Sequence, residues 1–315
     1  MNGKKILVFG GSGSLGHKIV DIYAKDNNVT IFSRDENKHW QMSLKFNGLN
    51  FVIGDIRNDR RVTECINDTS PDYIVIASAL KHIDRCEYEL DETFATNCQG
   101  TLNVLRNVNK ECECVVFVST DKACSPVNTY GLTKALGEKA IVEMAYKTRS
   151  KSNCRFVNIR YGNILNSRGS IIEILDRIGD DVGVSSFKLT HPEMTRFIMT
   201  QEESVKLLHY ALTSGESGDT IIPKIKSMKI KDLIEIFAEK YSKDMEISGL
   251  RPGEKLHEAL LNENEMFRVS ETDDHYIIRA PFRQNTSESV FRYDSSIPLI
   301  DKDNLTEYLI EKGYL

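Results

Sequence analysis

KILVFGGSGSLG, from Lys5 to Gly16, sets the architecture of this chain. Its first five residues form an apolar run that predicts a short buried strand. The glycines that follow have the spacing G-x-x-G-x-x-G, and Leu15, Ile19, Ile22 and Tyr23 then recur at the period of a helix. A glycine turn lets the backbone approach a pyrophosphate, and the start of the helix offers it N–H groups and a favourable dipole. The order strand, glycine turn, helix therefore predicts a dinucleotide site, against the alternative of a turn without a ligand.

Strand-like runs alternate with amphipathic stretches over the first half of the chain. The further predicted strands are residues 29–32, 50–53, 73–77, 113–118 and 156–160, and the helices include 94–108 and 133–147. This alternation predicts an α/β fold with a Rossmann-type, doubly wound parallel sheet. Ligands bind such sheets beyond the carboxyl ends of the strands, so residues just after the strands are expected to line one crevice.

The pattern becomes less regular after residue 160. A helical stretch at 230–241 and a charged loop at 251–255 indicate a smaller, lid-like region. We expect the dinucleotide-binding domain to comprise residues 1–162 and about 195–227. The substrate-binding region is then about 163–194 and 228–315, so the two are interleaved.

Composition excludes several classes of protein. The 315 residues are 40% hydrophobic and carry a net charge of −5, which argues against nucleic acid or an anionic membrane as the main partner. No apolar run approaches the roughly 18 residues of a membrane span, and the N-terminus does not resemble a signal peptide. Seven cysteines and seven histidines show no metal-ligand spacing. We therefore expect a cytoplasmic protein with reduced thiols and no metal.

Ser33 and Arg34 end the second predicted strand, where dinucleotide folds contact the adenosine ribose. An acidic residue here favours NAD, whereas a hydroxyl and a guanidinium suit the 2′-phosphate of NADP. Lys38 is a further candidate for this contact. The alternative is that Arg34 is a solvated surface charge, because Asp35 and Glu36 follow it directly. The prediction is NADP.

Tyr130 and Lys134 are four residues apart, which places both on one face of a helix. A neighbouring positive charge favours the phenolate, so the tyrosine becomes a usable base. The preceding Thr120-Asp121-Lys122 adds a hydroxyl, a carboxylate and a second amine. Two separate acid–base sets predict more than one proton transfer in the same site.

The motifs together resemble those of one enzyme family. The matching stretches are GGSGSLG, IFSRDENK, GDIRN, ASALKHID, STDKACSPVNTYGLTK, RYGNILNSRGS, HPEMTRFIMT, IPKIKSMKIKDL and RPGEKLHE. In them the chain resembles the extended short-chain dehydrogenase/reductases, and within these the UDP-N-acetylglucosamine 4,6-dehydratases of polysaccharide and nonulosonic-acid biosynthesis. The chain departs from the family pattern at residues 77–84 and matches it poorly beyond residue 279.

The resemblance implies a reaction cycle with residues in named roles. Tyr130, helped by Lys134, takes the proton of the hydroxyl on sugar carbon 4 during oxidation, while Thr120 hydrogen-bonds that oxygen. Lys122 then removes the proton from carbon 5, and Asp121 protonates the departing hydroxyl on carbon 6. The alternative for Lys122 is a structural lysine that bridges to Asp121 or to the cofactor phosphate. For Lys122 to act as a base, we expect burial and the cations Lys134 and Lys81 to lower its pKa.

The resemblance also implies the binding residues. Those expected to hold NADP are Gly10, Ser12, Gly13, Ser14, Leu15, Gly16, Ser33, Arg34, Lys38, Asp55, Ile56, Ala77, Ala79, Lys81, Asn97, Tyr130 and Lys134. Those expected to hold the UDP-sugar are Lys81, His82, Asn163, Arg168, Thr190, Met194, Arg196, Arg251 and Glu254. For Met194 and His82, ordinary packing and a satisfied loop histidine are the alternatives.

A chain of this length that keeps Tyr130 resembles the type of dehydratase that inverts carbon 5. The alternatives are a retaining 4,6-dehydratase and an NADP-dependent nucleotide-sugar epimerase, which needs Tyr130 and Lys134 but not Asp121 and Lys122. A non-catalytic NADP-binding sensor is the alternative from another class. Members of the family are commonly homo-oligomers, and we expect one here.

Overall fold

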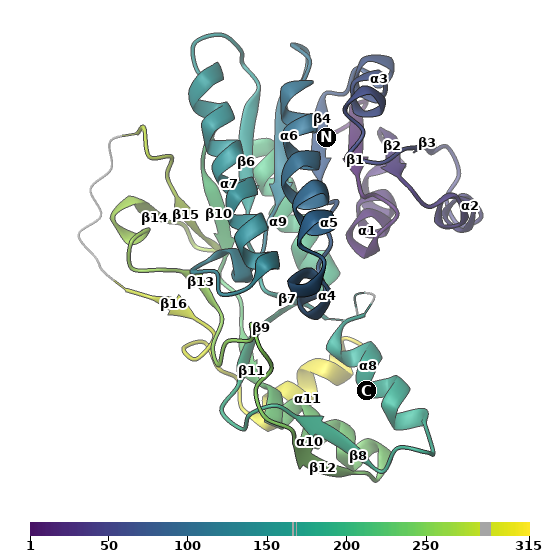
Figure 1. The fold of residues 1–315 in the computed structure, drawn as a ribbon, viewed down its shortest axis with the longest axis vertical. Helices are drawn as coiled ribbons and strands as arrows, with labels where there is room; N and C mark the ends of the chain where they lie inside the picture. The colour runs from purple at the N-terminus through teal and green to yellow at the C-terminus, as the bar shows by residue number, and fades with distance from the viewer. Residues whose placement is uncertain (166, 168, 284–290) are drawn as a thin grey trace.

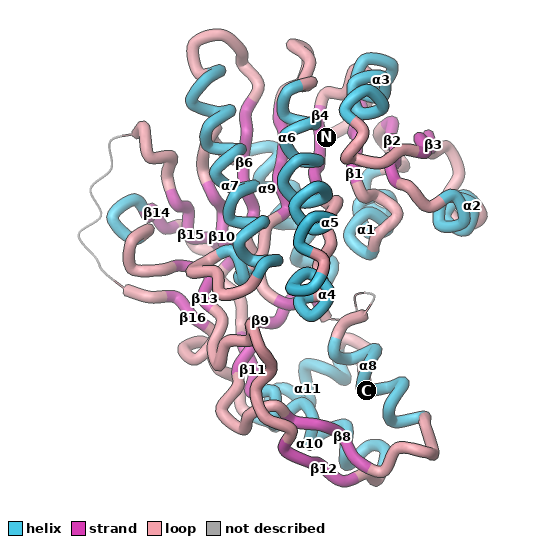
Figure 2. Tube along the Cα trace, viewed as in Figure 1, coloured by secondary structure: helices cyan, strands magenta, loops and turns pink. Residues whose placement is uncertain are grey.

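The computed structural model of the chain describes residues 1–165, 167, 169–283 and 291–315. A larger lobe is built around an extended sheet, and a smaller lobe lies beyond one end of its strands (Figure 1). The N-terminus lies in the larger lobe and the C-terminus in the smaller one (Figure 1). Helices stand on either side of the sheet (Figure 2).

The large sheet has the strand order β14-β15-β10-β6-β5-β4-β1-β2-β3. Its strands are β1 (Lys5–Phe9), β2 (Asn28–Ser33), β3 (Asn50–Ile53), β4 (Tyr73–Ile76), β5 (Cys114–Val118), β6 (Arg155–Ile159), β10 (Thr220–Pro223), β14 (Val269–Glu271) and β15 (His275–Ile278). All neighbouring pairs from β3 to β10 are parallel, and β15 and β14 are added antiparallel. The order of β3 to β6 is that of a dinucleotide-binding sheet, with its switch point between β1 and β4.

Helices and helical turns connect these strands. They are α1 (Ser14–Tyr23), α2 (Glu36–Ser43), α3 (Asp59–Thr69), α4 (Ile83–Tyr88), α5 (Leu90–Phe94), the π-helical turn η1 (Ala95–Gln99), α6 (Gly100–Arg106), the 3-10 turn η2 (Asp121–Ala123), α7 (Thr129–Thr148) and α9 (Gln201–Ser214).

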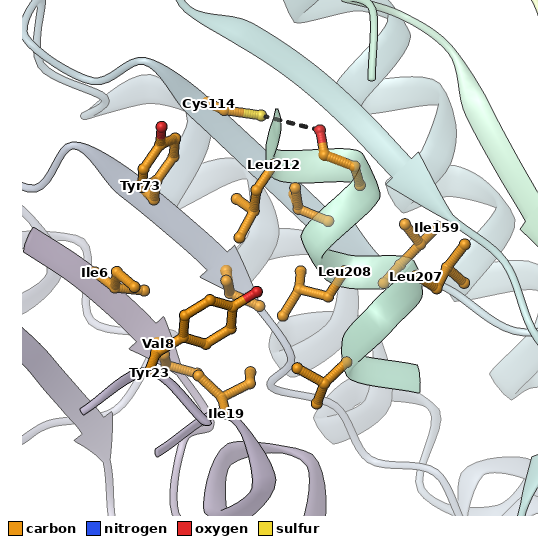
Figure 3. Packing of buried hydrophobic residues seen from close by; sticks show 14 of the residues in the cluster. Ile6, Val8, Ile19, Tyr23, Tyr73, Cys114, Ile159, Leu207, Leu208 and Leu212 are labelled. Atoms are coloured by element: carbon orange, nitrogen blue, oxygen red, sulfur yellow. Dashed lines mark hydrogen bonds between the residues drawn. The ribbon is translucent and has the colours of Figure 1, made fainter. Parts of the chain in front are cut away.

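Alternating side chains of the buried strands build two cores, one on each face of the sheet. Ile6 and Val8 of β1 pack with Ile19 of α1 and Leu208 of α9 on one face (Figure 3). Leu7 and Phe9 point to the opposite face, where α3, α6 and α7 cover them. The central strands are therefore almost continuously apolar, as Ile6–Phe9 of β1, β4 and Val115–Val118 of β5 show, which a sheet covered on both faces requires.

The smaller lobe has its own core of side chains from α8 (Ile171–Asp180), β8 (Ser186–Leu189), α10 (Ile230–Tyr241), β12 (Asp244–Ile247) and α11 (Lys302–Glu311). The remaining elements are β7 (Asn163–Ile164), β9 (Thr195–Met199), β11 (Ser227–Lys229), β13 (Ala259–Leu261), η3 (Met266–Arg268) and β16 (Tyr293–Asp294). The strands among these, together with β8 and β12, form three small sheets with the strand orders β11-β9-β7, β12-β8 and β13-β16.

The predicted α/β fold is confirmed, and the six predicted strands agree with β1 to β6 to within one residue at each end. One expectation about the first helix is wrong: Ile22 is 44% exposed, so it lies off the buried face of α1. Within the predicted substrate-binding region, β14 and β15 extend the large sheet, and the division into two domains stays a proposal. No helix in the described part of the chain has the length and apolar character of a membrane span.

Candidate active site

A cavity of about 910 Å³ runs along the carboxyl ends of β1, β2, β4, β5 and β6. Sixteen of the seventeen predicted cofactor residues line it: Gly10, Ser12, Gly13, Ser14, Leu15, Gly16, Ser33, Arg34, Lys38, Asp55, Ile56, Ala77, Ala79, Lys81, Tyr130 and Lys134. Asn97 is the exception. It is buried behind the wall, where its amide bonds both backbone groups of Leu80 and the hydroxyl of Thr133. Asn97 therefore fixes the backbone of Leu80, which lines the cavity, but does not line the cavity itself.

The glycine turn fits a dinucleotide by steric criteria. Gly10 has φ +82°, and a Cβ there would lie 2.7 Å from the backbone nitrogen of Ser78. A Cβ on Gly16 would lie 1.8 Å from the carbonyl oxygen of Gly11. Gly13 caps α1 without a side-chain bond, so the first turn of the helix faces the cavity with backbone N–H groups. These are the features a pyrophosphate needs.

The far end of the cavity carries the predicted ribose contacts. The Arg34 side chain is 53% exposed and its Nη1 lies 3.4 Å from Asp55 Oδ2. Ser33 Oγ lies 2.7 Å from His39 Nε2, and Lys38 pairs with Asp35 at 2.7 Å. Asp55 has a stronger partner in Arg57, whose Nη2 lies 2.6 Å away. Arg34 is thus held only weakly and lies at the rim of the cavity.

Tyr130 and Lys134 lie in the first two turns of α7, as predicted. The helix begins where Asn128 Oδ1 accepts a hydrogen bond from Gly131 N at 2.7 Å. Lys134 is buried, with its Nζ 3.8 Å from the centre of the Phe117 ring, and desolvation lowers the pKa of Lys134 to about 7. The tyrosine and the lysine therefore enter the cavity from one helix face.

Burial dominates the ionisation of Tyr130. Desolvation raises the pKa of its phenol to about 12, and the Lys122 ammonium is the main group that opposes this. The expectation that Lys134 supplies the charge favouring phenolate is wrong for this substrate-free structure. The reason is that desolvation drives Lys134 toward its neutral form, whereas Lys122 is held as a cation.

Asp121 and Lys122 form a buried ion pair at the end of β5. Asp121 Oδ1 accepts from Lys122 Nζ at 3.0 Å and from Thr120 Oγ1 at 2.9 Å. Asp121 is fully buried, and its Oδ2 has no hydrogen-bond partner among the described residues. Thr120 and Lys122 also line the cavity beside Tyr130. The two predicted acid–base sets therefore meet at one place.

The expected lowering of the pKa of Lys122 is wrong. Burial does act to lower this pKa, but the carboxylates of Asp121 and Glu258 outweigh it and the pKa is raised. The cation that opposes them is Arg196, not the expected Lys134 and Lys81. In the substrate-free protein Lys122 is an ammonium, so its role as a base requires a proton to leave it first.

The predicted sugar-nucleotide residues fall into two groups. Lys81, His82 and Asn163 line the cavity, while Arg168 lies outside the described residues. The described lining does not include Thr190, Met194, Arg196, Arg251 or Glu254.

The residues of this second group have other surroundings. Met194 is 3% exposed in the core of the smaller lobe and its sulfur accepts from Thr190 Oγ1, which favours a packing role. Arg196 is buried and donates to the carbonyl oxygen of Thr195. Arg251 N donates to Glu254 Oε2 in an exposed turn.

Sequence reasoning missed a buried ionic network behind the predicted catalytic residues. Arg160 donates to both carboxylate oxygens of Glu138 and to both of Glu265. Ser119 Oγ donates to Glu138 Oε1 at 2.5 Å, which ties the network to the start of the Thr120–Lys122 segment. Glu138 was within reach of sequence reasoning, because it follows Lys134 by four residues on the same helix face. Glu258 was present only as the last residue of RPGEKLHE, with no role assigned to it, and Glu265 gave no local signal.

The comparisons with known proteins agree with this geometry. A family model described as polysaccharide biosynthesis protein matches residues 6–280. An uncharacterised membrane protein of Methanocaldococcus jannaschii is 37% identical over 99% of this chain and 97% of its own length. A UDP-N-acetylglucosamine 4,6-dehydratase (inverting) of Campylobacter jejuni is 35% identical over 96% of this chain and 86% of its own. A UDP-glucose 4-epimerase of Rickettsia felis is 36% identical over 87% of this chain and 82% of its own.

One solved structure is similar over the whole chain. Pen from Bacillus thuringiensis superposes with a TM-score of 0.92 at 30% identity, covering 100% of this chain and 99% of that one. The match therefore includes the smaller lobe as well as the dinucleotide-binding sheet. On these matches, the chain belongs to the polysaccharide biosynthesis protein family.

Proposed function

We propose that the protein is an NADP-dependent 4,6-dehydratase of UDP-N-acetylglucosamine that inverts the configuration at carbon 5. The observation that carries this proposal is the Asp121–Lys122 ion pair, in which Lys122 lines the cavity together with Tyr130 and the fully buried Asp121 lies directly behind the lining. Loss of water needs a base and an acid in addition to the tyrosine, and this pair supplies them. The similarity to the Campylobacter jejuni dehydratase supports the choice of substrate.

Residues at the cavity wall would hold the cofactor. The glycine turn and the start of α1 suit the pyrophosphate, and Arg34 suits a 2′-phosphate. A bound nicotinamide dinucleotide supplies the oxidation at sugar carbon 4 and the closing reduction at carbon 6. Tyr130 takes the proton of the carbon-4 hydroxyl, and Thr120 lies beside it to hydrogen-bond that oxygen.

Because the pKa of the Tyr130 phenol is raised, its ionisation requires a positive charge close to the phenol oxygen. Lys134 lies one turn further along α7, and a pKa of about 7 leaves its amine only about half protonated at pH 7. A negative phosphate or a developing phenolate nearby favours the charged form of Lys134, which in turn favours the phenolate of Tyr130. The pair is therefore proposed to act together only in the loaded cavity.

The Asp121–Lys122 pair supplies both groups that the loss of water requires. One proton passes from the Lys122 ammonium to Asp121 across their 3.0 Å hydrogen bond, which leaves an amine and a carboxylic acid with no change in net charge. The amine then takes the carbon-5 proton, which the ketone at carbon 4 has made acidic. Asp121 gives its proton to the carbon-6 hydroxyl, which leaves as water. Both side chains are then back in their starting charge states. As carbon 6 is reduced, carbon 5 takes up a proton that comes from solvent, and delivery to the opposite face of the ring inverts its configuration.

The substrate would enter between the two lobes. Lys81, His82 and Asn163 line the cavity and are proposed to contact the sugar nucleotide. Arg168, Thr190, Met194, Arg196, Arg251 and Glu254 stay proposals for the nucleotide end. For Met194, its burial in the smaller-lobe core favours the packing alternative.

A nucleotide-sugar 4-epimerase is the second candidate, favoured by the similarity to the Rickettsia felis protein. An epimerase uses Tyr130 and Lys134 but has no need of an acid and a base for loss of water. The two reactions give different products: dehydration yields a 4-keto-6-deoxy sugar, whereas epimerisation keeps the 6-hydroxyl. If the protein is a dehydratase, the alternative to inversion is a retaining 4,6-dehydratase, which keeps the configuration at carbon 5.

One experiment tests the proposal. The protein is incubated with UDP-N-acetylglucosamine in deuterated water and the product is followed by NMR. The proposal expects a 4-keto-6-deoxy sugar with deuterium at carbon 5 and inverted configuration there. If the product is UDP-N-acetylgalactosamine with an intact 6-hydroxyl, the protein is an epimerase instead. If the product is the 4-keto-6-deoxy sugar with retained configuration at carbon 5, the enzyme is a retaining dehydratase and only the proposed inversion is wrong.

Self-association is part of the same proposal. The neighbouring helices α5 and α7 expose Leu90, Phe94, Leu132 and Leu136, each by about half of its surface. A row of exposed apolar side chains on adjacent helices suits a second copy of the chain. A cytoplasmic location is also proposed, because all seven cysteines are buried free thiols.

A further inference from the structure

Glu258 is a buried carboxylate that the proposed reaction does not use. It is 2% exposed, and it directly precedes β13 in the segment that returns from the smaller lobe. Its Oε1 lies 3.8 Å from Lys122 Nζ and its Oε2 lies 3.6 Å from Lys255 Nζ. Glu258 Oε2 has no hydrogen-bond partner among the described residues. Lys122 thus lies between two carboxylates from distant parts of the chain.

The charges that face Lys122 come from four elements. Asp121 belongs to η2, Glu258 precedes β13, Arg196 lies on β9, and the Tyr130 phenol lies on α7. The two carboxylates favour the ammonium form of Lys122, while Arg196 and burial oppose it. Lys255 faces Glu258 rather than Lys122 and donates to the carbonyl oxygen of Cys124 at 2.8 Å.

We propose that Glu258 is a positioning residue, which holds the Lys122 side chain between two carboxylates and keeps it an ammonium in the substrate-free protein. Its consequence for catalysis rests on the proposed function: an ammonium accepts no proton, so Glu258 sets how readily Lys122 passes its proton to Asp121 and becomes a base. Glu258 ends the segment that also carries Arg251 and Glu254. The position of this segment and the charge of Lys122 are therefore coupled.

The backbone at Glu258 is anchored independently of its carboxylate. Glu258 N donates to Ser295 Oγ at 3.0 Å, and Ser295 N donates to the Glu258 carbonyl oxygen at 2.8 Å. Glu258→Gln keeps the shape of the side chain and removes only its charge. This variant is therefore expected to fold, and Glu258→Asp provides a second variant that keeps the charge at a shorter reach.

The direct test is an NMR titration of the ¹³C-labelled lysine side chains without substrate. The Lys122 signal is assigned by its loss in Lys122→Met. In the wild type we expect a titration midpoint above the ordinary lysine value, and in Glu258→Gln a midpoint lower by about 1 to 3 pH units, the usual effect of an opposite charge within about 4–6 Å. Glu258→Asp should restore part of the shift. Exposed Glu263, five residues along the chain, is the control: Glu263→Gln should leave the Lys122 signal unchanged.

A catalytic readout separates this inference from the proposed function. At a fixed pH, deuterium uptake at carbon 5 should be faster in Glu258→Gln than in the wild type, because Lys122 gives up its proton more readily. An unchanged Lys122 midpoint in folded Glu258→Gln, or a midpoint in Glu258→Asp as low as that of Glu258→Gln, would overturn the inference even if the enzyme dehydrates its substrate. A shifted midpoint in a protein that does not turn over UDP-N-acetylglucosamine would support the Glu258 contact and reject the proposed function.

Discussion

Glu138→Gln tests whether the ionic network behind the active site holds the segment from β13 to Glu265 against the end of β6 and α7. Arg160 is 2% exposed and makes two hydrogen bonds to Glu138, two to Glu265 and one to the carbonyl oxygen of Leu260. Glutamine has nearly the same shape, but it turns one acceptor into a donor that faces the guanidinium. It also removes one of the two negative charges that compensate Arg160.

The expected magnitude follows from burial. Removing one partner of a buried ion pair costs about 3–5 kcal/mol, and the remaining Glu265 places this variant at the lower end, about 3 kcal/mol. With an unfolding entropy of roughly 2.1 cal/mol/K per residue, that loss lowers Tm by about 4–5 °C for a chain of this length. Equilibrium denaturant unfolding and thermal scanning measure both quantities.

Glu143→Gln is the matched control on the same helix. Glu143 is more than half exposed and pairs with Lys147, which is equally exposed. Exposed ion pairs of this kind contribute little to the free energy of unfolding, so the unfolding transition of Glu143→Gln should stay close to that of the wild type. Equal losses in Glu138→Gln and Glu143→Gln, or no loss in Glu138→Gln, would refute the structural role given to the network.

Two further predictions concern the cavity. In Tyr130→Phe, oxidation at carbon 4 should fall by roughly 10² to 10⁴-fold, as expected for the loss of a positioned base, and rapid deuterium uptake at carbon 5 in this variant would contradict the role of Tyr130. In Arg34→Asp, the preference for NADP over NAD should reverse, with a loss of about 1.5–3 kcal/mol in NADP binding measured by calorimetry; equal affinities of the wild type for both dinucleotides would remove the basis for this prediction.

Local patterns predicted the sheet and the cofactor cavity well, because their signals lie within short segments. The apolar run and glycine turn of residues 5–16 define β1, the turn and the start of α1. The four-residue spacing of Tyr130 and Lys134 places them together whatever the rest of the chain does.

The long-range charge contacts of the site could not be predicted from the sequence. Glu258 comes within 3.8 Å of Lys122 from 136 positions along the chain, so no local pattern could reveal this second carboxylate, which with the adjacent Asp121 reverses the expected pKa shift. The same holds for Glu265 on Arg160, 105 positions apart. Fold-level contacts of this kind also decide that Met194 packs in a core while Arg196 faces Lys122.

The most direct test of the central claim, that the Asp121–Lys122 pair carries the loss of water, is a single-turnover experiment on Lys122→Met in deuterated water. Exposed Lys139→Met serves as the control. We predict that Lys122→Met still binds UDP-N-acetylglucosamine and still oxidises carbon 4, so that the absorbance of the reduced cofactor accumulates. It should show no deuterium at carbon 5, and dehydration should fall by roughly 10² to 10⁴-fold. Near-normal dehydration by Lys122→Met would contradict the claim.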